Sequence, residues 1–277
     1  MNLFNEILDF TNYKPLGLNY YGAKKLIAPQ IFQLMHERHF KRHGKKAEYF
    51  LDCFGGGGSM SLAALQLGYK AIYNELRPDL CTFFRGVKDG KSVKLAQEIS
   101  REEFKAIGKI PKECRTFDEV AKMLFFSFNF SGVDNRGFAY GKHYHLSVPF
   151  FDAMKGLNFA NFEVKNGDYF DFLALEIEPS EIMIYADIPY QDKRSKKNYR
   201  GIYDSRFYLS EFLEFCDGLQ GQGYEVYVSE YNAPSEDFEC ILKIPKIVNS
   251  VGRWGAKAVK KEKIFVLKDS ENERQAI

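Results

Sequence analysis

The chain has 277 residues, of which 45% are hydrophobic and 27% charged, and its 39 Lys and Arg nearly balance its 37 Asp and Glu. This composition excludes a mainly disordered chain and provides for one large core or a core with a smaller lobe. No apolar run approaches the ~20 residues that a membrane helix needs.

The N-terminus, MNLFNEILDFTNYK, carries acidic residues where a secretory signal has basic ones, so we expect a cytoplasmic protein. The cysteines are odd in number and widely spaced: Cys53, Cys81, Cys114, Cys216 and Cys240. This spacing predicts buried free thiols and no metal site. Basic residues gather in three clusters, at 36–46, 193–200 and 253–263, in spite of a net charge of only +2.

The first third of the chain alternates helix and strand. In chain order the predicted elements are a helix over 24–39, a strand over 47–54, a glycine run, a helix over 59–68 and a strand over 70–76. The last four form a βαβ unit. Pro29 leaves open whether the first turns of the first helix form. The apolar runs favour strands buried on both faces, as in a parallel sheet covered by helices.

Between about 79 and 157 this alternation breaks down. Helical segments at 94–107 and 117–128 lead into an aromatic region punctuated by glycines, and we interpret the whole stretch as an inserted lobe. Alternation then returns, with a strand over 181–187, a helix over 209–223, a strand over 224–231 and a last strand over 263–267.

A run of four glycines, Gly55 to Gly58, joins the first predicted strand to its helix. A phosphate-binding P-loop is excluded because Ser59 follows with no lysine before it, and the spacing does not fit G-x-G-x-x-G. Glu75, at the end of the next strand, can accept both hydroxyl hydrogens of a ribose, so the pattern favours a nucleoside cofactor. The open alternative is a flexible turn.

The strand over 181–187 ends in Asp187-Ile188-Pro189-Tyr190. A carboxylate and a carbonyl can accept the two hydrogens of a planar amine, and the ring of Tyr190 can stack on it. Strand ends of this kind bind ligands in open α/β sheets. The open alternative is a strand that leaves the sheet through a proline turn.

In this order the motifs resemble the DNA methyltransferases that act on the exocyclic amine of adenine, of the Dam type in the D12 class. The resemblance covers about 19–267 and includes NYYGAKK, FLDCFGGGGS, KNGDYFDF and VYVSEYN. It implies a Rossmann-like α/β fold, with a mixed, mostly parallel sheet flanked by helices. It also implies a catalytic domain over 1–78 and 158–277, with a mainly helical recognition domain inserted over 79–157.

The resemblance assigns catalytic and cofactor-binding residues, and the basic clusters then suggest where DNA binds. The catalytic residues it implies are Asp187, Ile188, Pro189 and Tyr190. The residues implied to bind S-adenosylmethionine are Tyr20, Gly22 and Lys24 on its methionine part, Glu75 on its ribose, Asp168 on its adenine, and also Asp52, Phe54, Gly56, Gly58, Ser59, Tyr169 and Asp187. The DNA-binding residues expected, all in the insert or the basic clusters, are Arg136, Lys193, Arg194, Lys196, Lys197, Arg200, Arg253 and Lys257.

Two departures accompany the resemblance. Ile188 replaces the first proline of the family's Pro-Pro-aromatic motif, although that position acts through its carbonyl, which isoleucine also has. The segment FNFSGVDNRGFAYGK only loosely resembles the family's recognition turn, so no recognition sequence is implied.

The implied function is transfer of a methyl group from S-adenosylmethionine to a flipped-out adenine in duplex DNA. We expect a cytoplasmic monomer without metal, of a kind that fits restriction-modification. Two alternatives stay open: a non-catalytic relative that binds nucleic acid or cofactor, and an enzyme of the same fold that methylates RNA or the amine of cytosine. Cytosine enzymes commonly have Ser at the first catalytic position, where this chain has Asp187.

Overall fold

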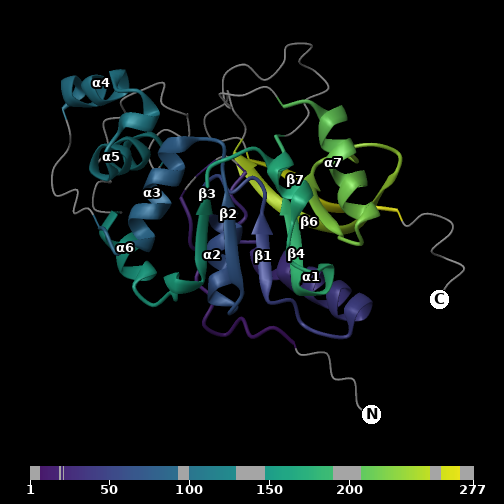
Figure 1. Cartoon of the computed structure of the whole chain (residues 1–277). Helices are drawn as coiled ribbons and strands as arrows, with labels where there is room; N and C mark the ends of the chain where they lie inside the picture. The colour runs from purple at the N-terminus through teal and green to yellow at the C-terminus, as the bar shows by residue number, and fades with distance from the viewer. Residues whose placement is uncertain are drawn as a thin grey trace, which may run out of the picture. The chain divides into compact units, whose positions relative to one another are not determined.

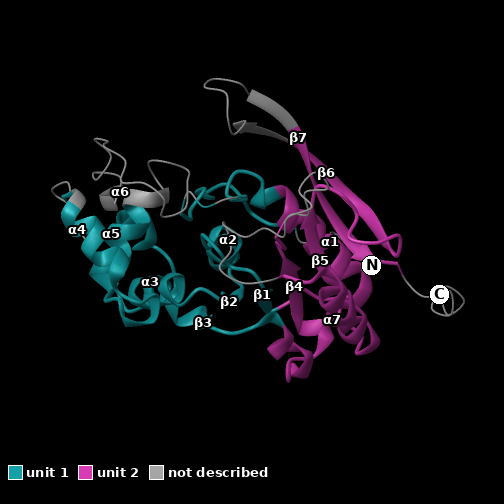
Figure 2. Ribbon diagram, turned by 90° about the horizontal axis from the view of Figure 1, so that it is seen from above, with its two compact units in different colours: residues 1–29, 48–169 teal, residues 30–47, 170–277 magenta. Residues whose placement is uncertain are grey.

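The computed structural model describes residues 7–18, 20, 22–92, 100–128, 147–189, 207–249 and 257–268 (Figure 1). The chain divides into two compact units, drawn in different colours in Figure 2. Unit 1 contains residues 1–29 and 48–169, and unit 2 contains residues 30–47 and 170–277. In the ranges described, no helix is long and apolar enough to cross a membrane.

The strands of unit 1 are parallel and follow the order β3-β2-β1. They are β1 (Tyr49–Asp52), β2 (Lys70–Asn74) and β3 (Phe162–Lys165). Helix α2 (Ser59–Gln66) joins β1 to β2 and packs against both, as Figure 1 shows. Because nearly every residue of β1 and β2 is buried, the predicted parallel strands with two covered faces are confirmed.

Among the described residues between β2 and β3, four helices occur: α3 (Pro78–Lys88), α4 (Arg101–Lys109), α5 (Phe117–Phe128) and α6 (Ser147–Met154), with the short 3-10 helix η1 (Lys112–Cys114) before α5. Aromatic rings form their core: Phe83 stacks on Phe117 at 5.8 Å between centroids and also contacts Phe125 and Phe151. The helix predicted over 117–128 is confirmed. The domain boundaries at 79 and 157 stay a prediction.

Unit 2 has strands in the order β4-β5-β7-β6. They are β4 (Ile182–Ala186), β5 (Val226–Glu230), β6 (Phe238–Asn249) and β7 (Lys257–Leu267). The β4–β5 pair is parallel, and β7 is antiparallel to both β5 and β6. A mixed, mostly parallel sheet flanked by helices, as predicted, is therefore confirmed. The helices that the structure describes in this unit are α7 (Leu209–Gly221) and most of α1 (Ala28–His43). Its described 3-10 helices are η4 (Tyr169–Ala174), which begins in unit 1, and η5 (Pro179–Glu181).

Several predicted elements differ from the structure. Helix α1 begins at Ala28, later than predicted, and Pro29 stands in its first turn, where a helix needs no N–H donor. Strand β7 begins six residues before the predicted position at 263, and β3 and β6 were not predicted. All five cysteines are free thiols, but Cys114 and Cys240 are exposed, which corrects the prediction that all are buried.

Candidate active site

The glycine loop is packed tightly against neighbouring side chains of unit 1, to which it belongs. Gly56 and Gly58 have positive φ angles of 47° and 74°, and Gly58 caps the start of α2. A Cβ on Gly55 would lie 2.2 Å from the ring of Tyr73, and a Cβ on Gly58 would lie 2.5 Å from the ring of Phe84. The loop is therefore a closely packed turn that leaves no room for a Cβ at Gly55 or Gly58, and its role in binding a cofactor stays a prediction.

Glu75 reaches back to this loop from the end of β2. Its carboxylate accepts hydrogen bonds from the backbone N–H of Gly56 at 2.8 Å and of Arg77 at 3.0 Å. Burial raises the pKa of Glu75 above its ordinary value, while the hydrogen bonds from Arg77 and Gly56 act in the opposite direction. The side chain remains partly exposed, so its oxygens can still accept hydrogen bonds from a ligand.

The N-terminal segment covers the same loop. The backbone N–H of Leu18 donates to the carbonyl of Gly57 at 2.8 Å. A Cβ on Gly56 would lie 3.1 Å from the ring of Tyr20, so this ring passes close to the loop. Lys24 is buried, and its Nζ donates to the carbonyl of Gly22 at 2.8 Å. The structure thus brings Tyr20 to the glycine loop and places Lys24 close behind it in the chain.

Two buried hydroxyl groups flank the start of α2. Ser61 donates to the carboxylate of Asp52 at 2.7 Å, and both side chains are buried. The hydroxyl of Ser59 is also buried, but within the described part of the chain it has no hydrogen-bond partner. Since buried polar atoms are nearly always hydrogen-bonded, Ser59 has an unused donor next to the glycine loop.

Side-chain amides join the carboxyl ends of the three strands of unit 1. Asn74 donates to the carbonyls of Cys53 and Gly167, both at 3.1 Å, and Asn166 donates to the carbonyl of Glu75 at 2.8 Å. The loops that follow β1, β2 and β3 therefore meet at one edge, where ligands bind in parallel sheets.

Two predicted cofactor residues follow this junction. Asp168 is exposed, whereas Tyr169 is buried, with its ring 5.2 Å from that of Phe54. Tyr169 therefore packs under the loop, and its hydroxyl is the only part that suits a polar contact. Leu76 was not predicted. It follows Glu75 and is 46% exposed, so it places an apolar side chain at the rim of the same sheet edge. Its position just after a predicted strand was the signal that could have pointed to it.

Asp187 directly follows β4 in unit 2. All five residues of β4 are buried, Ile188 is only 1% exposed, and Asp187 is partly exposed. The register pairs Ala186 with Val228, so Asp187 stands beside Ser229 at the carboxyl end of two parallel strands. The expectation that Asp187 faces the glycine loop, which belongs to unit 1, stays a prediction.

The comparisons with known proteins identify the family. The model of the D12 class N6 adenine-specific DNA methyltransferases matches residues 20–248, most of the chain. This chain is a D12 class methyltransferase. Among curated proteins, no sequence matches it significantly.

Two solved structures are also similar to the D12 chain. A protein named as an RNA methyltransferase from Pyrococcus horikoshii has 13% sequence identity to this chain and a TM-score of 0.40. The structural alignment covers 92% of this chain and 87% of that protein. A SAM-dependent methyltransferase from Agrobacterium tumefaciens has 11% identity and a TM-score of 0.35, covering 87% and 63%. Both sequence identities and both TM-scores are too low to assign a substrate.

The remaining predicted residues of the D12 chain lie outside the described part or have undescribed side chains. Those outside it are Tyr190, Arg136, Lys193, Arg194, Lys196, Lys197, Arg200 and Arg253. Lys257 is the first residue of β7, and its side chain is not described. Within the described ranges, no three His, Cys, Asp or Glu side chains gather as a metal site would require.

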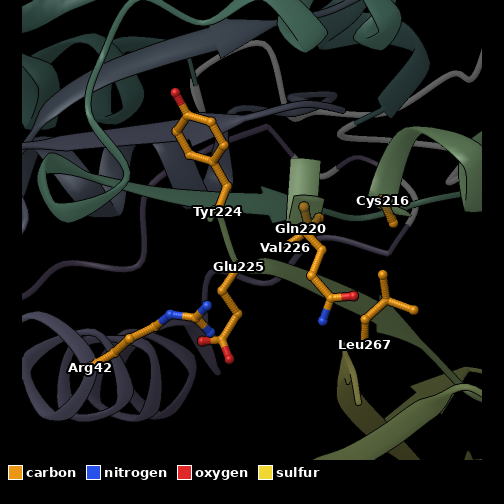
Figure 3. Close-up of a pocket in the computed structure, with 7 residues that line it drawn as sticks. All are labelled: Arg42, Cys216, Gln220, Tyr224, Glu225, Val226 and Leu267. Carbon is orange, nitrogen blue, oxygen red and sulfur yellow. The ribbon is translucent and has the colours of Figure 1, made fainter. Parts of the chain in front are cut away.

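A small hollow in unit 2 is not the active site (Figure 3). It is lined by Arg42, Cys216, Gln220, Tyr224, Glu225, Val226 and Leu267. The side chains of Arg42 and Glu225 point toward one another in Figure 3. Val226 begins β5, whereas Asp187 follows the end of the parallel strand β4, so the hollow lies at the opposite ends of these strands. It has room for about one water molecule at most, far less than a ligand cleft of about 300–1,000 Å³.

Proposed function

We propose that this D12 methyltransferase transfers the methyl group of S-adenosylmethionine to the exocyclic amine of adenine in duplex DNA, with Asp187 and the Ile188 carbonyl binding that amine. The observation that carries the proposal is the position of Asp187 directly after a buried parallel strand, in a chain of this family. The carboxyl ends of such strands are where ligands bind.

The residues of unit 1 fit the cofactor. The glycine loop leaves its backbone free of Cβ atoms, and Glu75 is partly exposed beside it. Ser59 has a buried hydroxyl with no hydrogen-bond partner among the residues that the structure describes. Glu75 would accept the ribose hydroxyls, and Tyr20 and Lys24 would hold the methionine part. S-adenosylmethionine, when bound, supplies an electrophilic methyl group on a sulfonium.

The role of Asp187 in this proposal is to position the adenine amine. The lone pair of the adenine amine is delocalised into the ring, so the amine is a poor nucleophile. Hydrogen bonds from its two N–H groups to the Asp187 carboxylate and the Ile188 carbonyl favour a tetrahedral nitrogen, whose lone pair is then available for attack. The same carboxylate stands ready to accept the proton that the methylated nitrogen releases.

Isoleucine in place of proline at 188 is compatible with this role. The Ile188 side chain is buried, so it anchors the main chain as a proline ring would. Pro189 restricts Ile188 to extended backbone, which fixes the direction of its carbonyl. The carbonyl itself is the same group in either residue.

The substrate must leave the duplex to reach this site. Flipping an adenine out of the stack costs a few kcal/mol, roughly the loss of its stacking and pairing, and the ring of Tyr190 would stack on the flipped base. The basic residues expected around Lys193 and Arg253 would bind phosphates. A protein with ~6–10 phosphate contacts loses at least about a thousandfold in affinity between ~50 and ~200 mM salt.

The experiment that tests the function uses the full chain, S-adenosylmethionine and unmethylated duplex DNA. After digestion to nucleosides, mass spectrometry should detect N6-methyladenine, and a reaction without S-adenosylmethionine is the control. Methylcytosine as the product, or methylation of RNA alone, would assign another substrate. Binding of DNA and cofactor without any methylated nucleoside would identify a non-catalytic relative and contradict the proposal.

A further inference from the structure

Strands β6 and β7 continue past the rest of the sheet of unit 2 (Figure 2). Strand β7 pairs with β5 only from Phe265 to Lys263, whereas it pairs with β6 along its whole length, from Leu267 to Lys257. Residues 244–249 and 257–262 therefore form a two-stranded extension, and together with the pair Lys243 and Lys263 at its base we name it the basic ribbon.

The basic ribbon leaves the sheet at the edge where Asp187 lies. Lys263 pairs with Glu230, which is the last residue of β5. Strand β4 is parallel to β5, and Asp187 follows its last residue. The ribbon therefore projects from the carboxyl ends of the strands, next to the end that carries Asp187.

Three lysines share one face of the ribbon, whereas Lys260 lies on the other face, with its Nζ 4.7 Å from the centre of the Tyr231 ring. The register sets Lys243 directly opposite Lys263 and Pro245 opposite Lys261. Because alternate residues of a strand point to the same face, these three lysines lie on one face. Lys243 and Lys261 are exposed and Lys263 is partly exposed, and within the described ranges none of the three makes an ion pair.

The direct facing of Lys243 and Lys263 is unfavourable in the free protein, although Lys263 has the acidic Glu230 of β5 opposite it on its other side. Directly opposite residues of an antiparallel pair have Cβ atoms ~4.5–5.5 Å apart, and like charges at that distance destabilise the pair. The carboxylate next in sequence, Glu262, points to the other face, where it accepts a hydrogen bond from Ser229 at 2.9 Å. Lysines on open strand edges also hinder aggregation, but that role does not require two of them to face each other.

We propose that the lysine face of the basic ribbon binds the phosphate backbone of the duplex DNA substrate, next to the site of methyl transfer. A phosphate between Lys243 and Lys263 would remove their repulsion and release bound counterions. A two-stranded β-ribbon also fits the major groove, which is about 12 Å wide. The inference rests on the proposed function and adds β6, with Lys243, and the residues Lys261 and Lys263 to the expected DNA interface.

The test compares two variants that each remove two positive charges. K243Q/K263Q removes the facing pair of the ribbon. K41Q/K45Q is the matched control, because both lysines are exposed and Lys45 pairs with Glu181, which precedes β4 at the opposite ends of the strands. Affinity for an unmethylated duplex is measured by fluorescence anisotropy between roughly 50 and 200 mM KCl, because the release of counterions changes DNA affinity strongly over this range. K243R/K263R keeps both charges.

Each phosphate contact contributes about 0.9 to the slope of log affinity against log salt. Because one phosphate lies between the two lysines in this proposal, K243Q/K263Q should lower the slope by about 0.9, so that its affinity falls about three- to fourfold less than that of the wild type over this salt range. K41Q/K45Q and K243R/K263R should keep the wild-type slope. An unchanged slope in K243Q/K263Q, or an equal change in the control, overturns the inference. Absence of methyl transfer by the wild type would instead count against the proposed function, and the binding slopes would still test the ribbon.

Discussion

Single glycines of the loop before α2 are constrained by the protein itself as well as by any ligand. Tyr73 lies against Gly55 and also donates its hydroxyl to the carbonyl of Gly56 at 2.9 Å. Phe84 lies against Gly58. The loop is thus preorganised by the core, and its backbone reaches a ligand in a fixed conformation.

Gly58→Ala should destabilise the protein by about 1–3 kcal/mol, because the new Cβ meets the Phe84 ring at a positive φ that alanine rarely adopts. Gly108→Ala in α4 is the control: its Cβ meets nothing within 4 Å, and it should stabilise by roughly 0.5–1 kcal/mol. Urea unfolding of both variants measures the two effects. A larger loss at Gly108 than at Gly58 would be inconsistent with a packed loop.

His39 gives the protein a defined response to pH. It is buried in α1 with its Nε2 3.1 Å from the carbonyl oxygen of Ser180. Desolvation lowers the pKa of His39 from 6.5 to about 4, against the hydrogen bond to Ser180, and the charges of His43 and His36 lower it further. Because the unfolded chain binds this proton at higher pH than the folded one, the stability is complete above pH 6.5 and is lost as the pH falls toward 4.

The free energy of unfolding should therefore fall by about 2–3 kcal/mol between pH 6.5 and 4 through His39 alone. His39→Gln keeps a side-chain donor for Ser180 but does not titrate, so its unfolding free energy should change less over this window. Urea unfolding at closely spaced pH values measures both proteins. Identical pH slopes for wild type and variant would show that His39 does not titrate as described.

Among the elements, α3 depends on a buried ion network at its start. Arg77 binds Asp79 through two hydrogen bonds of 3.1 and 2.8 Å, and Arg115 lies 3.8 Å from the same carboxylate. Desolvation favours the neutral acid, but the hydrogen bonds and charge of Arg77 outweigh it and lower the pKa of Asp79. Arg115 also donates to the carbonyl of Ile110, so the network joins α3 to the residues between α4 and α5.

Asp79→Asn should destabilise the protein by about 3–5 kcal/mol, since it leaves two buried guanidinium groups without a carboxylate. Asp152→Asn is the matched control, because its ion pair with Lys155 is exposed and should contribute less than about 0.5 kcal/mol. Thermal unfolding of the two variants measures the difference. Equal effects would mean that the buried network contributes no more than a surface pair.

Elements with continuous apolar runs were predictable, and those with mixed patterns were not. The run from β1 through α2 to β2, and the strands β4 and β5, follow the sequence pattern closely. Strand β3 was missed because its four residues are only half buried. Strand β6 was missed because Pro245 and a register shift between Cys240 and Leu242 interrupt its alternation.

Helix α3 could have been predicted, since Pro78 stands at its first position and Leu80, Phe83, Phe84 and Val87 form one buried face. The site was predictable where its residues are contiguous, as in the glycine loop. It was not predictable where partners are distant in sequence. The bonds from Asn74 to Gly167 and from Ser229 to Glu262 join residues that no local pattern relates.

For the whole molecule, the proposed function draws on residues of both compact units. The glycine loop, Glu75 and Ser59 belong to unit 1, whereas Asp187 and the basic ribbon belong to unit 2. Cofactor affinity should therefore depend mainly on unit 1, and methyl transfer and DNA affinity should also depend on unit 2. Substitutions in unit 1 should therefore lower cofactor affinity, whereas substitutions in unit 2 should lower methyl transfer or DNA affinity and leave cofactor affinity nearly unchanged.

The most direct measurement compares Asp187→Ala with the wild type in two assays: single-turnover methyl transfer to duplex DNA, and binding of S-adenosylmethionine by calorimetry. The rate should fall by at least about a hundredfold, because the amine loses the acceptor that orients it, while the Kd for S-adenosylmethionine changes by less than about threefold. Asp187→Asn keeps the shape of the side chain and should also be slow. An Asp187→Ala variant that methylates DNA at the wild-type rate, or that loses cofactor binding as completely as activity, would contradict the role of Asp187 as the residue that binds the adenine amine.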